Sequence, residues 1–156
     1  MIRIHIQQVG VKKLAPKTTL LRQWAKQTLS HQIKAAEITI RIVDKKEMTQ
    51  LNKKFRNKKG PTNVLSFPIF LSKDIKFKIP PLGDIIICSE VIHKEATEQN
   101  KLPEAHYAHM VVHGIFHLLG YNHERNEEAH KMESLEIAAL KRLGFNNPYD
   151  TGKDNK

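Results

Sequence analysis

Three histidines and a glycine in the C-terminal half constrain this 156-residue chain more than any other feature. The segment HGIFHLLGYNH places His113 and His117 four residues apart, so a helix would put both imidazoles on one face, one turn apart. Gly120 can end that helix by adopting a positive φ, which lets the chain turn back. His123 would then return towards the first two rings. The spacing therefore predicts that three imidazoles hold one metal ion.

Zinc is the metal that this donor set favours. Three neutral imidazoles suit zinc, although nickel, copper and iron also bind such a set. Three protein ligands leave a fourth position open, which is typical of catalytic rather than structural zinc. We therefore expect one Zn²⁺ per chain, held by His113, His117 and His123. The opposing interpretation is that these histidines are ordinary packed or surface residues on an apolar helix.

The residue after the first histidine distinguishes this motif from that of the metzincin proteases. Their motif, H-E-x-x-H-x-x-G-x-x-H, has the same spacing and carries a glutamate that acts as the general base. Here that position is Gly114. Either another part of the backbone packs against this glycine, or it clears space beside the metal. Without the glutamate, activation of water would depend more on the metal itself.

The charge of the chain indicates a polyanionic partner. The formal net charge is +10 at pH 7, and residues 45–59 contain seven Lys or Arg against one Glu. Clustered lysines and arginines attract phosphates and release counterions, so a nucleic acid fits this charge. The alternative is a basic surface that serves only solubility. The uneven placement of the charge favours one basic face.

Length, cysteine content and hydropathy limit the setting of the protein. The length predicts one domain, residues 1–149, followed by a frayed tail at 150–156. Cys88 has no partner for an internal disulfide, which indicates a reducing compartment. The N-terminus lacks the apolar core of a signal peptide, and no window reaches the length of a transmembrane helix. We expect a cytoplasmic protein that does not contact a membrane.

Hydrophobic periodicity predicts a mixture of strands and helices, and hence an α+β single domain. Strands are expected at residues 2–7, 37–43, 64–68 and 82–89, and the apolar run of the last suggests a central position. Helices are expected at about 17–33, 45–55, 89–99, 103–119 and 127–143. Asp44 and Ser89 are the predicted N-caps of two of them, and Pro103 fits a first helical turn. Residues 69–81 are expected to form an exposed excursion.

Candidates outside the motif carry less information by themselves. Arg56 lies in a basic turn that leads into a strand, and a guanidinium can hold a phosphate with two hydrogen bonds. In isolation, however, this residue would be interpreted as a solvated loop arginine. His106 and His109 share the helical stripe of His113 and His117. We expect them to be core or surface histidines with satisfied hydrogen bonds rather than partners of the ligands.

Three segments, FRNKKGPTNVLSFP, LGDIIIC and HMVVHGIFHLLGYNH, together resemble the YbeY-type bacterial endoribonucleases. The resemblance runs from about residue 37 to Tyr149. It implies zinc on the three motif histidines, a functional arginine at Arg56, and a zincin-like fold in which helices cover a mixed four-stranded sheet. Asn122 is a departure, because the family often has aspartate in G-Y-D-H. Any role of that position is therefore open.

The resemblance implies a zinc-dependent, single-strand-specific endoribonuclease in 16S ribosomal RNA maturation and ribosome quality control. Its partners would be ribosomal RNA and the small ribosomal subunit. In this interpretation zinc activates water and Arg56 clamps the phosphate. One alternative is a ribosome-binding assembly factor in which zinc is mainly structural. A less favoured alternative is a metallopeptidase whose base comes from elsewhere, and Gly114 argues against it.

Overall fold

The computed structural model describes residues 1–10 and 14–150 and has an α+β architecture. Four strands form one mixed sheet in the order β1-β2-β4-β3. Strands β1 (Ile2–Gln8), β2 (Ala36–Val43) and β4 (Pro81–Cys88) are parallel, and β3 (Val64–Pro68) pairs antiparallel with β4 at one edge. The predicted α+β class, the mixed four-stranded sheet and the central place of β4 are confirmed.

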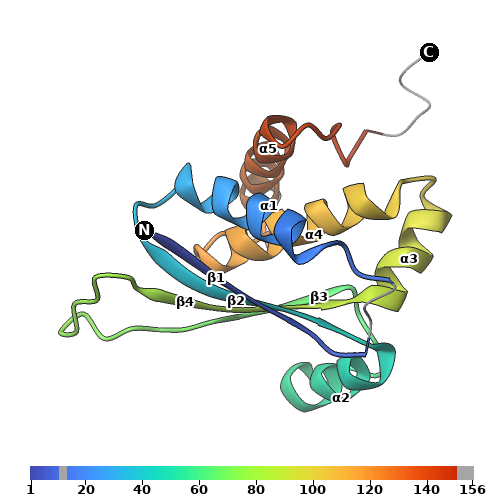
Figure 1. Cartoon of the computed structure of the whole chain (residues 1–156), viewed down its shortest axis with the longest axis horizontal. Coiled ribbons are helices and arrows are strands. Elements are labelled where there is room, and N and C mark those ends of the chain that lie inside the picture. The colour runs from blue at the N-terminus through green and yellow to red at the C-terminus, as the bar shows by residue number, and fades with distance from the viewer. Residues whose placement is uncertain (11–13, 151–156) are drawn as a thin grey trace.

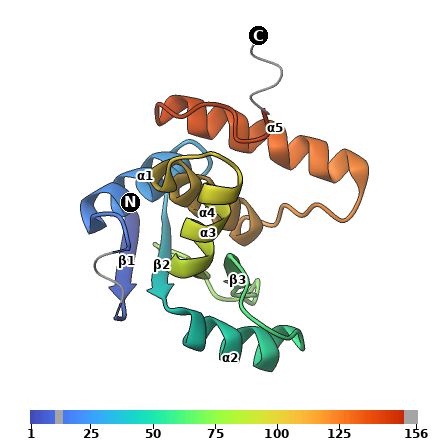
Figure 2. The same ribbon diagram turned by 90° about the vertical axis from the view of Figure 1, so that its right-hand side faces the viewer.

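Helices cover both faces of this sheet. Figure 1 shows α1 (Thr18–Ser30), α4 (Pro103–Leu118) and α5 (Asn126–Arg142) on one side, with α3 (Ser89–Glu98) towards one end. Helix α2 (Lys45–Arg56) lies alone on the opposite side (Figures 1 and 2). The basic segment is therefore carried largely by a helix that is separate from the main helical layer.

The alternation of side chains along the strands divides the core into two clusters. Ile85 and Ile87 of β4 face the main helical layer, where they pack with residues of β2 and α4. Ile86 and Cys88 face the other way and pack against α2 through Met48. Because both faces of β4 are covered, its sequence is apolar at consecutive positions rather than at alternate ones. This accounts for the apolar run that marked the strand as central.

The ends of the helices agree with local sequence signals in most places. The side chain of Asp44 accepts a hydrogen bond from the backbone N–H of Glu47 at 2.8 Å, so the predicted cap of α2 is confirmed. Pro103 occupies the first turn of α4, as predicted. The prediction that Ser89 caps α3 is wrong, because Cys88 holds the N-cap position and Ser89 is already helical and fully buried. The strand leads into this helix without a loop, and no room is left for an exposed cap.

Between β3 and β4 the chain extends beyond the body of the sheet (Figure 1). This excursion carries exposed apolar side chains, and Phe70 is 92% exposed. The predicted exposed excursion is thus confirmed for residues 69–78, whereas Pro81 already belongs to β4. In the part of the chain that the structure describes, no helix is long and apolar enough to cross a membrane. The predicted tail, residues 150–156, lies outside the described residues except for Asp150.

Candidate metal centre

Helix α4 and the turn that follows it bring the three motif histidines together. His113 and His117 lie on one face of α4, and their Nε2 atoms are 3.0 Å apart. Gly120 has a φ of +100°, and the N–H of Tyr121 donates to the carbonyl of Phe116 at 3.0 Å, which closes the helix. The chain then doubles back, and the ring of His123 reaches 5.1 Å from that of His117 and 5.6 Å from that of His113.

This arrangement has the chemistry of a metal-binding site. One nitrogen from each of the three rings lies within 4.8 Å of the others, so the group could hold a metal ion. Burial, together with the neighbouring rings of His113 and His123, lowers the pKa of His117 to about 4. That ring is therefore neutral at pH 7 and keeps a lone pair for a ligand bond. Three imidazole nitrogens that meet at this spacing fit Zn²⁺.

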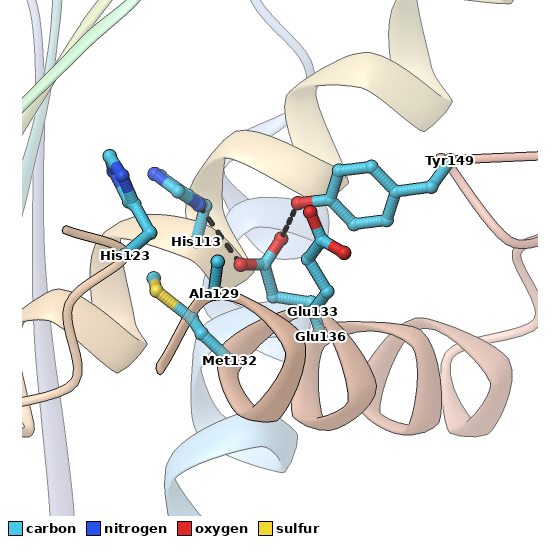
Figure 3. Close-up of a pocket in the computed structure, with 7 residues that line it drawn as sticks. All are labelled: His113, His123, Ala129, Met132, Glu133, Glu136 and Tyr149. Atoms are coloured by element: carbon cyan, nitrogen blue, oxygen red, sulfur yellow. Dashed lines mark hydrogen bonds and ion pairs between the residues drawn. The ribbon is translucent and has the colours of Figure 1, made fainter. Parts of the chain in front are cut away.

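A buried carboxylate lies directly behind the three histidines. Glu136 of α5 is 1% exposed, and its Oε2 lies 3.0 Å from Nδ1 of His113. Its Oε1 lies 2.8 Å from Nε2 of His109 and accepts from the hydroxyl of Tyr149 at 2.6 Å. Figure 3 shows Glu136 between His113 and Tyr149. Burial opposes ionisation of this carboxyl, but hydrogen bonds from the two histidines prevail and lower its pKa to about 2.

Sequence reasoning missed Glu136. The signal was a glutamate on the buried face of an amphipathic helix, where Met132, Ala139 and Leu140 are its buried neighbours. A charged residue in such a stripe is almost never fully buried unless it is paired. Its partners, however, lie 23 and 27 residues earlier and 13 residues later in the chain. The pattern could therefore have flagged the residue without naming what it binds.

A second group with metal-binding geometry shares one of these residues. Atoms of His109, His113 and Glu136 also lie within 4.8 Å of one another. In this group the carboxylate oxygens are already at hydrogen-bond distance from both rings. His113 belongs to both groups, with Nε2 facing His117 and Nδ1 facing the carboxylate. The same ring therefore links the three-histidine group to α5.

The other histidines of the stripe are buried and hydrogen-bonded. His106 pairs with Glu95 at 2.8 Å, and Glu95 also accepts from the side chain of Asn63 at 3.1 Å. His109 pairs with Glu136 and lies 3.2 Å from the hydroxyl of Tyr149. Each ring is satisfied through Nε2, whereas the Nδ1 atoms of both have no partner among the described residues. His106 fits the expected structural role, but His109 contacts the carboxylate that holds a candidate ligand.

A cavity of about 390 Å³ opens on the other side of the histidines. His113, His117 and His123 form one wall, and Arg56 at the end of α2 forms part of another. Residues 63–66 of the β3 segment and Asn122 also line it. Arg56 is exposed, and its guanidinium makes no hydrogen bond or ion pair within residues 1–10 and 14–150. The structure thus brings the predicted arginine and the predicted metal ligands to one cavity.

The role of Gly114 in the fold is close packing. A Cβ at this position would lie 2.8 Å from Cγ2 of Ile85 in β4. Real Cβ contacts are essentially never this short, so the glycine lets α4 lie directly on the sheet. The structure therefore supports the packing interpretation of Gly114. The group that packs against it is the side chain of Ile85, however, and not another part of the backbone.

We expect Gly114→Ala to lower the free energy of unfolding by up to about 2 kcal/mol. The added methyl group overpacks Ile85, which costs about 1–3 kcal/mol, while the helix propensity of alanine offsets about 1 kcal/mol. In an Ile85→Ala background the overlap is gone and only the propensity gain remains, so the same substitution should stabilise the protein. Urea unfolding of the four proteins of this cycle measures the reversal. Equal effects in both backgrounds would remove Ile85 as the reason for the glycine.

Comparison with known proteins places the chain in a family. The chain belongs to the endoribonuclease YbeY family, whose model matches residues 4–144. Two curated relatives are both named endoribonuclease YbeY. The one from Nitrosococcus oceani is 45% identical over 150 residues, which cover 96% of this chain and 98% of that protein. The one from Xylella fastidiosa (strain M12) is 49% identical over 148 residues, with coverages of 90% and 92%.

A solved structure supports the fold. The solution structure of a protein from Thermotoga maritima matches with a TM-score of 0.57 and 26% identity, and covers 96% of this chain and 99% of that one. The resemblance noted in the sequence is confirmed, and the family match begins earlier, at residue 4 rather than near residue 37. The chain is thus a member of a family of endoribonucleases, as the motif segments indicated.

Proposed function

We propose that this protein is a zinc-dependent endoribonuclease that cleaves single-stranded RNA during maturation of 16S ribosomal RNA and in ribosome quality control. The observation that carries the proposal is the convergence of His113, His117 and His123 on a cavity that also contains Arg56. Zinc bound there would act as a Lewis acid and lower the pKa of a water molecule. Membership in the endoribonuclease YbeY family supports RNA as the substrate.

Other residues of the cavity can bind the phosphate and leave the metal accessible to RNA. The exposed guanidinium of Arg56 can hold a phosphate with two hydrogen bonds and stabilise the negative charge that develops there. His123 is exposed, so an RNA backbone can approach the histidines from solvent. The position after the first histidine has no room for a glutamate, because Gly114 there is packed against Ile85 of the sheet. This absence of the protease base disfavours a peptidase.

The charge of the surface supports ribosomal RNA and the small subunit as partners. Helix α2 and the residues after it carry the basic segment, and Lys53, Lys54 and Lys58 are exposed. Arg56 ends the same helix, so the basic surface leads to the cavity. The buried free thiol of Cys88 suits a reducing compartment, and we place the activity in the cytoplasm.

We expect RNA binding to weaken steeply with salt, because each phosphate contact releases counterions. Reversing Lys53, Lys54 and Lys58 to glutamate should make the slope of log affinity against log salt less negative by about 2. Each phosphate contact of a single strand contributes roughly 0.7 to that slope, and three contacts would be lost. The control reverses Lys17, Lys26 and Lys34, three exposed lysines in or beside α1, and makes the same change in net charge. If both triple variants behave alike, α2 has no specific part in binding.

The test of the proposed function is cleavage of a single-stranded RNA by the purified, zinc-loaded protein. We expect endonucleolytic products, loss of activity with a chelator, recovery with zinc, and no cleavage of a peptide substrate. An assembly factor with structural zinc would bind RNA with the same salt dependence and leave it intact. RNA that stays uncut by the zinc-loaded protein would therefore favour the assembly-factor alternative.

A further inference from the structure

Three hydrogen-bond donors converge on one buried carboxylate behind the metal centre. The two carboxylate oxygens of Glu136 take part in three hydrogen bonds. Two are with ring nitrogens of His109 and His113, and the third is with the hydroxyl of Tyr149. An ionised carboxylate can only accept hydrogen bonds. The two ring nitrogens that face it, Nε2 of His109 and Nδ1 of His113, must therefore each carry a proton. A neutral imidazole has one N–H, so the other nitrogen of His113, Nε2, is left with the lone pair.

That lone pair is on the nitrogen that faces the other candidate ligands. Nε2 of His113 lies 3.0 Å from Nε2 of His117, on the side away from the carboxylate. We propose that Glu136 is a positioning residue, which selects the Nδ1–H tautomer of His113 and fixes the direction of its Nε2 towards the metal. This inference rests on the three-histidine centre of the proposed function and adds a residue that does not touch the metal.

The surroundings of Glu136 hold the carboxylate itself in place. Its helix, α5, packs on α4, which carries both histidines. Tyr149 reaches it from the C-terminal segment, and that segment is tied to the start of α4 because Lys101 donates to the carbonyl of Pro148 at 2.8 Å. Figure 3 shows Glu136 and Tyr149 joined on the side of His113 that faces α5. The carboxylate is thus held by its own helix α5, by His109 of α4 and by Tyr149 of the C-terminal segment, independently of its contact with His113.

Glu136→Gln makes the idea testable without a change of shape. The amide has one acceptor oxygen and one donor NH₂ group. If the oxygen keeps the two bonds at the Oε1 position, to His109 and Tyr149, then NH₂ faces Nδ1 of His113. Nδ1 must then accept, and the ring proton moves to Nε2, which is the wrong nitrogen for a metal ligand. In the opposite orientation the amide oxygen faces Nδ1 of His113 and keeps only that bond. NH₂ then faces Nε2 of His109, whose proton must move to Nδ1, a buried atom that has no partner in the described structure.

Glu133→Gln is the matched control. Glu133 lies on the same helix and lines the same cavity of about 300 Å³ as Glu136, but makes no hydrogen bond to a histidine among the described residues. Both substitutions remove one negative charge within one turn of α5. A general effect of charge on the metal would therefore appear in both variants, whereas the proposed positioning effect belongs to Glu136 alone.

Two measurements decide the proposal. ¹⁵N NMR of the imidazoles in the zinc-free protein should show His113 as Nδ1–H in wild type and Glu133→Gln, and as Nε2–H in Glu136→Gln. Competition with a chromophoric chelator should show zinc bound about 10–100-fold more weakly by Glu136→Gln only, as is usual for the loss of such a partner. Circular dichroism and urea unfolding confirm that each variant is folded.

An unchanged His113 tautomer in a folded Glu136→Gln protein would overturn the proposal. So would wild-type zinc affinity in that variant, which would leave Glu136 with a structural role only. The tautomer is measured without metal, so it is independent of whether the protein cleaves RNA. A shifted tautomer with no zinc binding even in wild type would instead contradict the three-histidine centre, while leaving the hydrogen-bond assignment intact.

Discussion

His117→Ala is expected to reduce zinc from about one ion per chain to a trace and to abolish RNA cleavage. The substitution leaves two histidine ligands, and a two-imidazole site holds zinc far more weakly than a three-imidazole site. His117 is the central member of the group, since its ring lies close to both His113 and His123. Elemental analysis of the dialysed proteins gives the stoichiometry, and gel analysis of a labelled RNA gives the cleavage.

The same variant distinguishes between the two groups that could hold a metal. The group of His109, His113 and Glu136 does not include His117, so an ion held there would survive the substitution. The control is His130→Ala, which removes an exposed histidine of α5 that lines neither of the two cavities described above. Equal zinc content in wild type, His117→Ala and His130→Ala would refute the assignment of the three motif histidines.

Local patterns were sufficient to predict the elements of this fold. Strand β4 was recognisable because an apolar run marks a strand that is covered on both faces, and β4 has a core cluster on each side. The cap at Asp44 and the proline at position 103 were also local signals. Ser89 was assigned wrongly because the sequence does not show that β4 joins α3 without a loop. The order β1-β2-β4-β3 depends on tertiary pairing, which no single segment encodes.

The residues of the candidate site also fall into those that a local pattern predicts and those that depend on tertiary packing. His113, His117 and His123 follow one local pattern, so their spacing in the chain is enough to predict that they meet. Arg56 reaches the cavity from α2, on the far side of the sheet from α4, and only the family resemblance singled it out. Glu136 required the packing of α5 on α4, because its partners are distant in sequence. Of the two residues that tertiary packing brings to the site, Arg56 is thus predicted only through the family resemblance, and Glu136 is missed.

Arg56→Lys is expected to lower the rate of RNA cleavage by about 10²–10³-fold while zinc content and folding stay unchanged. Arg56 lines the same cavity as the histidines, where its guanidinium can share the negative charge that develops on a phosphate. Lysine keeps the charge but loses the flat, two-pronged donor geometry, so substrate binding should suffer less than the rate. Arg56→Ala should be worse, and should also bind RNA more weakly because the charge itself is gone.

Lys53→Ala is the control for position 56, because it removes one charge from an exposed site on the same helix that does not line the cavity. Its rate at saturating RNA should equal that of wild type, with at most a small rise in the RNA concentration needed for half-maximal rate. Single-turnover measurements separate the chemical step from binding. Full activity of zinc-loaded Arg56→Ala would remove the arginine from the mechanism, because the metal and its three histidines would then suffice. If Arg56→Ala and Lys53→Ala instead lost activity only below saturating RNA, and to the same extent, both positions would act only by attracting RNA.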